Sequence, residues 1–127
     1  MVATTIYACI SAGLLVFLAF QVINQRREHK VALGDGDIET LRRARSAHAN
    51  AAEYLPILLI LLFLLEHNST SQSLVHVCGL AMLSGRIVHA HAILKSNFKL
   101  RVLGMQITFG TLAVLILLNL LALTGLF

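Results

Sequence analysis

Four long apolar segments, separated by short polar stretches, constrain the fold of this chain more than any other feature of its sequence. The first runs from about residue 2 to 24 and contains no charged residue. The others cover approximately residues 41–66, 72–94 and 100–123. About 20 helical residues cross a hydrocarbon layer, so each segment is long enough to span a membrane. The sequence therefore predicts an all-α membrane protein, a bundle of four transmembrane helices in a single domain over residues 1–127.

The composition supports a membrane location. Only 13% of the residues are charged and 57% are hydrophobic, whereas soluble domains carry about 25% charged residues. The first basic residue is Arg26, so we expect residues 1–25 to remain as a span rather than to be removed as a signal peptide. Cys9 and Cys78 both lie in apolar segments, and we expect buried thiols rather than a disulfide.

The basic residues predict how the chain lies across the membrane. All ten lysines and arginines fall in the first loop, the start of span 2, the end of span 3 or the turn before span 4. With four spans these positions share one face, which the positive-inside rule assigns to the cytoplasm. We therefore expect an inner-membrane protein whose termini and Glu66–Ser73 loop are periplasmic. The pI of about 9.6 follows from this topology and does not indicate nucleic-acid binding, because aromatic residues do not alternate with the basic ones.

The loop before span 2 and the first half of that span are polar. We expect residues 25–37 to form a solvated loop, with Asp37 or Thr40 capping the next helix. Within span 2, spacings of three, four and three residues place Arg43, Ser46, Asn50 and Glu53 in one stripe. A carboxylate at this depth costs several kcal/mol unless it is paired or hydrated, so such residues usually face a bundle interior or a cavity. The structural alternative is a polar zipper that only fixes helix packing.

Further polar residues occur in spans 3 and 4. Arg86, His89 and Ile93 share one face of span 3, whereas His91 points elsewhere, so the two histidines do not converge and we expect no metal site. Arg101 begins span 4, where its alternative role is to snorkel to the lipid headgroups. Three residues share its helical face: Gly104, Met105 and Thr108.

Residues 43–56 carry a family resemblance. They read Arg-Ala-Arg-Ser-Ala-His-Ala-Asn-Ala-Ala-Glu-Tyr-Leu-Pro and resemble the second-helix signature of the MAPEG superfamily (membrane-associated proteins in eicosanoid and glutathione metabolism). That signature is approximately Arg-x-x-Arg-Ala-His/Gln-x-Asn-x-x-Glu-Tyr-x-Pro. The segment 84–86 with His89, and Arg101 with the Gly-Met pair at 104–105, are similar to bacterial members. Ser46 stands in place of the second arginine, and His89 and Ile93 stand where the eicosanoid enzymes have tyrosines.

The resemblance implies an assembly and a ligand. MAPEG proteins are homotrimers whose active sites lie between neighbouring subunits, near the cytoplasmic face, and bind glutathione. By this resemblance Arg101 is the catalytic residue that holds the glutathione thiolate. The resemblance also implies a set of glutathione-binding residues: Arg43, Asn50, Glu53, Tyr54, Arg86 and His89.

The expected function is therefore a membrane glutathione transferase or peroxidase that acts on lipophilic electrophiles, with glutathione as co-substrate and no metal. Two alternatives stay open from the residues. A small proton-coupled multidrug exporter also has four short spans and a membrane-embedded glutamate, although that glutamate normally lies in the first helix, and span 1 here has none. A non-catalytic membrane protein that retains the family fold is the second alternative.

Overall fold

Four helices make up most of the chain that the computed structural model describes, residues 2–68 and 71–125. They are α1 (Val2–His29), α2 (Glu39–His67), α3 (Gln72–Leu94) and α4 (Phe98–Ala122). Each is long and apolar enough to cross a membrane, which confirms the predicted all-α architecture with four spans. The limits of α3 agree with the predicted span 3.

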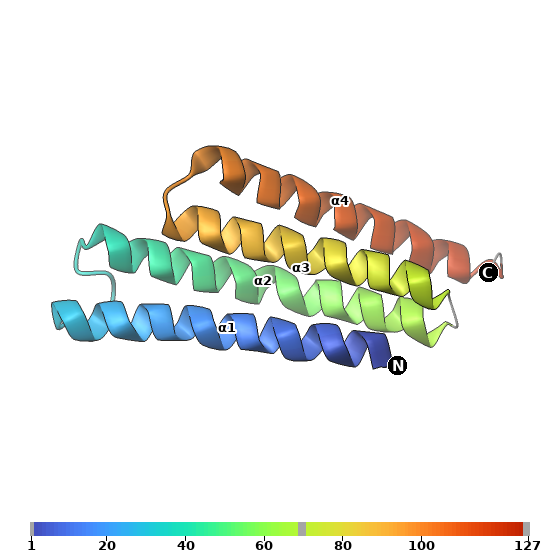
Figure 1. Ribbon diagram of the computed structural model, residues 1–127, viewed down its shortest axis with the longest axis horizontal. Coiled ribbons are helices and arrows are strands. Elements are labelled where there is room, and N and C mark those ends of the chain that lie inside the picture. Colours follow the sequence, from blue (N-terminus) through green and yellow to red (C-terminus); the bar gives the residue numbers. More distant parts are fainter. Residues whose placement is uncertain (1, 69–70, 126–127) are drawn as a thin grey trace.

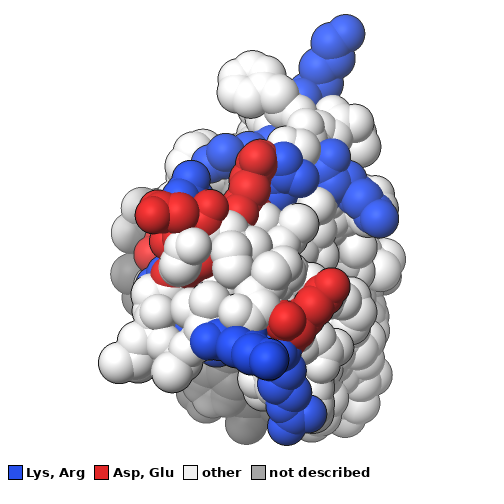
Figure 2. Space-filling model, turned by 90° about the vertical axis from the view of Figure 1, so that its left-hand side faces the viewer, with Lys and Arg blue, Asp and Glu red and all other residues white. Residues whose placement is uncertain are grey.

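The helices run antiparallel to their sequence neighbours, with α2 and α3 between α1 and α4 (Figure 1). Helix α1 packs against α2 and α3, and α4 packs against α3 and α2. The start of α1 and the end of α4 lie at one end of the bundle, and the α1–α2 loop and α3–α4 turn lie at the other. Figure 2 shows this second end, where Lys and Arg side chains gather with Asp and Glu among them. We call it the basic end.

The buried face of α2 organises the core. Its buried apolar residues recur every three or four positions: Leu41, Ala44, Ala47, Ala51, Leu55, Leu58, Leu62 and Leu65. Ala47 and Ala51 lie toward the basic end, where they pack with Leu18 of α1 and Ala90 of α3. The last three leucines, Leu58, Leu62 and Leu65, belong to the cluster around Tyr7 and Met82 toward the other end. Small residues at contacts let membrane helices approach closely, where packing replaces the hydrophobic effect as the source of stability.

The two cysteines differ in environment. Cys78 is buried in the core, as predicted, and both thiols are free. Cys9 is exposed, so the prediction of two buried thiols is wrong for Cys9. The reason is that Cys9 lies on the side of α1 that faces away from α2 and α3, where an apolar segment presents its side chains to lipid.

Helix α1 is five residues longer than the predicted span, and the expectation of a loop from Gln25 is wrong. The helix continues to His29, because charged residues have good helix propensity and cations suit a helix C-terminus. The loop then folds back over the helix end. The guanidinium of Arg26 donates hydrogen bonds to three loop carbonyls, those of Val31, Ala32 and Gly34, at 3.4, 3.2 and 3.0 Å.

The start of α2 also differs from the prediction, since neither Asp37 nor Thr40 caps it. The N-cap residue is Ile38, without a side-chain hydrogen bond, and Asp37 has a left-handed backbone with φ of 59°. Asp35 organises this turn instead. Its carboxylate accepts the Asp37 N–H at 3.0 Å and the Arg42 Nε–H at 3.0 Å. The Arg42 hydrogen bond holds the pKa of Asp35 below its ordinary value.

Glu66 lies in α2, which ends at His67, one residue beyond the predicted span 2; the loop expected from Glu66 therefore begins later. The Glu66 side chain is 5% exposed. One carboxylate oxygen accepts the Ala3 N–H at 3.0 Å and the other accepts the Thr4 N–H at 2.8 Å. The first N–H groups of a helix have no partner within the helix and favour a negative charge. Glu66 therefore caps α1 from the far end of α2.

Candidate functional site

The polar stripe of α2 is divided between two environments. Arg43 and Asn50 are half-buried, whereas Ser46 and Glu53 are exposed on the surface of the subunit. Glu53 thus presents a carboxylate at membrane depth that the subunit itself does not cover. The part of α2 that turns toward α3 and α4 meets a buried arginine.

Arg86 of α3 is fully buried, with 0% of its surface exposed, and connects three helices. Its guanidinium donates to the Asn50 side-chain carbonyl on α2. On α4 it donates to Thr108 Oγ1 at 3.2 Å and contacts Met105 Sδ at 3.7 Å. It also lies 5.2 Å from the centre of the Tyr54 ring. We call these five residues the Arg86 hub.

The charge of Arg86 is held by neutral groups. Within residues 2–68 and 71–125 it forms no ion pair, and its Nε is buried without a hydrogen-bond partner. A guanidinium tolerates this because its charge is delocalised and an aromatic face attracts it. Since Arg86 has no exposed surface, it acts on its surroundings through Asn50 and Tyr54, which it holds in place.

His89 lies beside the hub and has a defined tautomer. Its Nδ1 is 3.0 Å from Arg86 Nη2, and a guanidinium can only donate. Nδ1 therefore accepts, and the proton of the neutral ring lies on Nε2. Helix α4 approaches α3 closely at His89. A Cβ atom added to Gly104 would lie only 2.7 Å from the His89 backbone nitrogen.

A pocket of about 310 Å³ opens at the basic end, between the starts of α2 and α4 and the end of α3. We call it the basic pocket. Its lining includes Arg42, Arg43 and Arg101, together with Ser46 and Glu39. Glu39 pairs with Arg43, one helical turn along. Arg42 pairs with Asp35 and Asp37 beside the pocket, so Arg101 is the guanidinium of this lining that no carboxylate of the described residues pairs. Arg101 can therefore bind an anion, since arginine binds carboxylates and phosphates through paired hydrogen bonds.

A second, mainly apolar depression of about 410 Å³ follows the outer side of α4. We call it the α4 groove. Met105 and Phe109 line it, and Phe98 and Arg101 line both this groove and the basic pocket. Arg101 therefore lies at the boundary between the basic pocket and an apolar surface. The Tyr54 ring meets Phe109 edge-on at 5.8 Å, which connects the groove to the Arg86 hub.

The structure thus gathers the predicted site residues into two groups. Asn50, Tyr54 and Arg86 form part of the hub, with His89 beside it. Arg43 and Arg101 line the basic pocket. Glu53 belongs to neither group.

Metal-ligating residues do not cluster in the part of the chain that the structure describes. No group of three or more His, Cys, Asp or Glu side chains there is arranged to hold a metal ion. The site chemistry described above rests on guanidinium groups, amides and aromatic rings.

Comparison with known proteins identifies the family. The family model described as "MAPEG family" matches residues 4–121. The chain belongs to the MAPEG family. This confirms the resemblance seen in residues 43–56. Two relatives, from Escherichia coli strain K12 and Escherichia coli O6:H1 strain CFT073, are each 37% identical over 117 residues, which cover 92% of this chain and 89% of the relative. Both are named "Inner membrane protein YecN".

The structure also accounts for one departure from the MAPEG signature. Ser46 replaces the second arginine and lines the basic pocket, but Arg45 does not. Arg42 does, because residues four apart lie on the same side of a helix. Arg42 was not among the predicted site residues, although its spacing of four residues from Ser46 indicates a shared helical face.

Thr108 and Met105 were also absent from the predicted site of this MAPEG chain. Both contact Arg86. Their signal was present, since they share a helical face with Arg101 and Gly104. Their role depends on a contact between α3 and α4, which the residue spacing within a single helix cannot predict.

Proposed function

We propose that this MAPEG protein binds glutathione in the basic pocket and uses its thiolate to attack lipophilic electrophiles, as a transferase or peroxidase. One observation carries the proposal: Arg101 lines both the basic pocket and the apolar α4 groove. A charged peptide and an apolar compound bound in these two places would meet at this guanidinium.

The chemistry of glutathione suits the basic pocket. The tripeptide carries two carboxylates, and guanidinium groups hold such groups through paired hydrogen bonds. In this proposal the carboxylates of glutathione would share Arg42 with Asp35 and Arg43 with Glu39. The pocket volume of about 310 Å³ lies within the range of about 300–1,000 Å³ for small-molecule sites. Glutathione fills such a pocket with its sulfur directed toward Arg101.

Arg101 would supply the catalytic effect. An unperturbed thiol has a pKa of about 8.5, and only the thiolate is a strong nucleophile. A guanidinium beside the sulfur stabilises the thiolate by about 1.4 kcal/mol for each unit by which it lowers that pKa. The thiol proton passes to water, and the sulfur then forms a bond to an electrophilic carbon or oxygen in the α4 groove as that atom's leaving group departs.

The site is completed by a second copy of the chain in this proposal. Glu53 is exposed at membrane depth, where an uncovered carboxylate is costly. We infer that neighbouring copies cover this side of α2 in a homotrimer, the number that MAPEG resemblance implies, and that Glu53 then faces the glutathione ammonium. Native mass spectrometry in mild detergents is expected to give trimers, and only monomers or dimers would contradict the assembly.

The decisive experiment compares two arginine variants. Calorimetry of the purified protein is expected to show glutathione binding, and ultraviolet absorbance of the thiolate should titrate at lower pH than for free glutathione. Arg101→Ala should retain most binding but move the thiol titration to higher pH. Arg45→Ala is the matched control, because Arg45 lies at the same end of the molecule but does not line the basic pocket. An unchanged titration in Arg101→Ala would refute the role of Arg101.

The absence of any glutathione affinity in the wild-type protein would refute the enzymatic proposal as a whole. The exporter or the non-catalytic protein would then replace it. Orientation is tested separately with reporters fused after Phe127, since we propose that the basic end is cytoplasmic. A reporter active only in the cytoplasm would contradict that orientation.

A further inference from the structure

A third depression, of about 440 Å³, lies between α1 and α3 over the start of α2. We call it the α1–α3 groove. None of the residues assigned above to the basic pocket or the Arg86 hub lines it. Its character changes along its length, since one end is apolar and includes Leu14, Phe17 and Ile87, whereas the other includes Gln25, Thr40 and Lys95.

The groove has the dimensions of an extended chain. Its α1 wall is formed by Leu14, Phe17, Gln21 and Gln25, which are spaced three, four and four residues apart and so form one stripe. At about 1.5 Å per residue, this wall is about 16 Å long. Phe17 and Ile87 are about half exposed, so an acyl chain can enter from the side.

The polar end of the groove suits an anion. Its lining includes Lys95 and His91 and contains no carboxylate. Among the residues that the structure describes, Lys95 forms no ion pair. The side-chain oxygen of Gln25 is enclosed by the protein, and its nitrogen contacts Glu28 at 3.4 Å, so Gln25 forms part of the wall of the groove. A phosphate at the polar end would pair with Lys95.

The position of the groove indicates a lipid as the occupant. Ala44, which lines it, and Glu53 are nine residues apart on α2, and a rotation of about 100° per residue places them on opposite sides of that helix. The groove therefore opens away from the exposed polar stripe. Its apolar part lies within the candidate spans, and its polar part lies at the basic end. A membrane phospholipid has the same order of apolar chain and polar head.

We propose that the α1–α3 groove binds an anionic phospholipid from the membrane leaflet at the basic end. One acyl chain lies along Phe17 and Ile87, and the phosphate pairs with Lys95. Phosphatidylglycerol has this chemistry, whereas phosphatidylethanolamine carries no net charge. The site is independent of the proposed glutathione chemistry and survives if that proposal fails.

The test uses the absence of tryptophan from the sequence. Ile87→Trp places one fluorophore in the groove, and Val16→Trp places one on the exposed surface of α1 outside it. Both proteins are reconstituted in bilayers that contain a small fraction of phosphatidylglycerol or phosphatidylethanolamine with brominated acyl chains, which quench tryptophan on contact. Brominated phosphatidylglycerol should quench Ile87→Trp more strongly than brominated phosphatidylethanolamine does, whereas Val16→Trp should show no preference.

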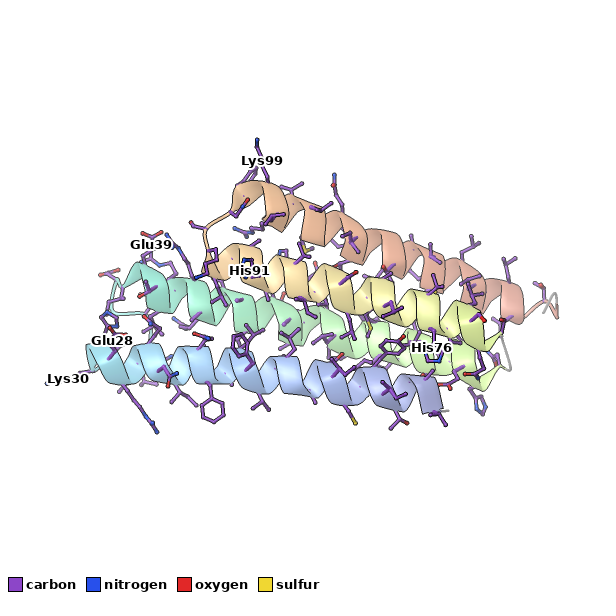
Figure 3. All side chains as sticks on the ribbon, in the orientation of Figure 1. Glu28, Lys30, Glu39, His76, His91 and Lys99 are labelled. Atoms are coloured by element: carbon purple, nitrogen blue, oxygen red, sulfur yellow. The ribbon has the colours of Figure 1, made fainter. Side chains whose placement is uncertain are left out.

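Charge variants on the Ile87→Trp background complete the test. Lys95→Gln should lower the phosphatidylglycerol preference about fivefold, the effect expected for one lysine at an anionic membrane surface. Lys99→Gln is the matched control, because Lys99 projects from α4 on the side away from α1 (Figure 3) and does not line the groove. His91, which does line the groove, lies on α3 (Figure 3). Native mass spectrometry of lipid retained by unlabelled wild-type and Lys95→Gln proteins repeats the comparison without the tryptophan.

Three results would overturn the proposal. Equal quenching by the two lipids in Ile87→Trp would show that the groove does not select an anion. Equal effects of Lys95→Gln and Lys99→Gln would show that attraction is spread over the basic end. No quenching by either lipid would show that protein, such as another copy of the chain, covers the groove.

Discussion

Gly104 is the position where one added methyl group should disturb both stability and the candidate site. A Cβ atom there would lie 2.7 Å from the His89 Cβ and 2.8 Å from its Cα. Carbon atoms in favourable contact are about 3.5–4.0 Å apart. In Gly104→Ala, α3 and α4 must therefore separate by about 1 Å at this point.

The size of the effect follows from two opposing terms. Overpacking a close contact costs about 1–3 kcal/mol. Alanine in place of glycine favours the helix by about 1 kcal/mol. Gly110→Ala isolates the second term, because Gly110 lies in the same helix and a Cβ atom there would meet nothing within 4 Å. The Gly104→Ala protein should thus be less stable than the Gly110→Ala protein by about 1–3 kcal/mol.

Reversible unfolding of the two variants in mixed micelles, followed by circular dichroism, measures this difference. Glutathione calorimetry on the same samples tests the connection with the site, since Arg101 lies one helical turn from Gly104 and should move with α4. We expect weaker binding for Gly104→Ala and unchanged binding for Gly110→Ala. Equal stability of the two variants would refute the argument that the α3–α4 distance is fixed by this glycine.

Three further predictions concern single carboxylates. Glu53→Gln should weaken glutathione binding by roughly 1–3 kcal/mol in calorimetry, because it removes the charge that faces the ligand ammonium; unchanged affinity would exclude that contact. Glu66→Gln should lower the free energy of unfolding by roughly 1–3 kcal/mol, since an amide N–H₂ would oppose the Thr4 N–H; stability equal to wild type would contradict the capping role. Arg42→Ala should raise the pKa of Asp35 toward its ordinary value, measured by NMR titration of the carboxyl group. Because that pKa is lowered in the folded protein, the stabilisation from this pair is present above the ordinary pKa and is lost as the pH falls through the lowered one.

Much of the fold follows from the sequence alone, because length and apolarity decide which segments cross a bilayer. The limits of α3 were predicted correctly since polar residues bound it closely on both sides. The end of α2 was predicted to within one residue, but the role of Glu66 was not, because Glu66 resembles a loop residue when only its neighbours along the chain are considered. Its partners, Ala3 and Thr4, are more than sixty positions away.

The site was predicted only within single helices. Periodicity correctly grouped Arg86 with His89 on α3. It also placed Arg43 and Asn50 in one stripe of α2, but the structure divides them between the basic pocket and the Arg86 hub. Periodicity gave no indication that Arg86 is buried and reaches Asn50 and Thr108, since these contacts depend on how three helices pack. Periodicity within one helix also cannot predict contacts between copies of the chain. In the proposed trimer such contacts would cover Glu53, which is exposed in the single subunit.

The capping of α1 by Glu66 also sets the relative depth of two membrane helices. Sliding α1 along α2 by one residue displaces it by about 1.5 Å, enough to break the hydrogen bonds to Ala3 and Thr4. At the other end, the loop held by Arg26 limits the same movement. The first two helices therefore have a fixed register as soon as the second has been synthesised. They can leave the insertion machinery as a finished helical hairpin, against which α3 and α4 then assemble.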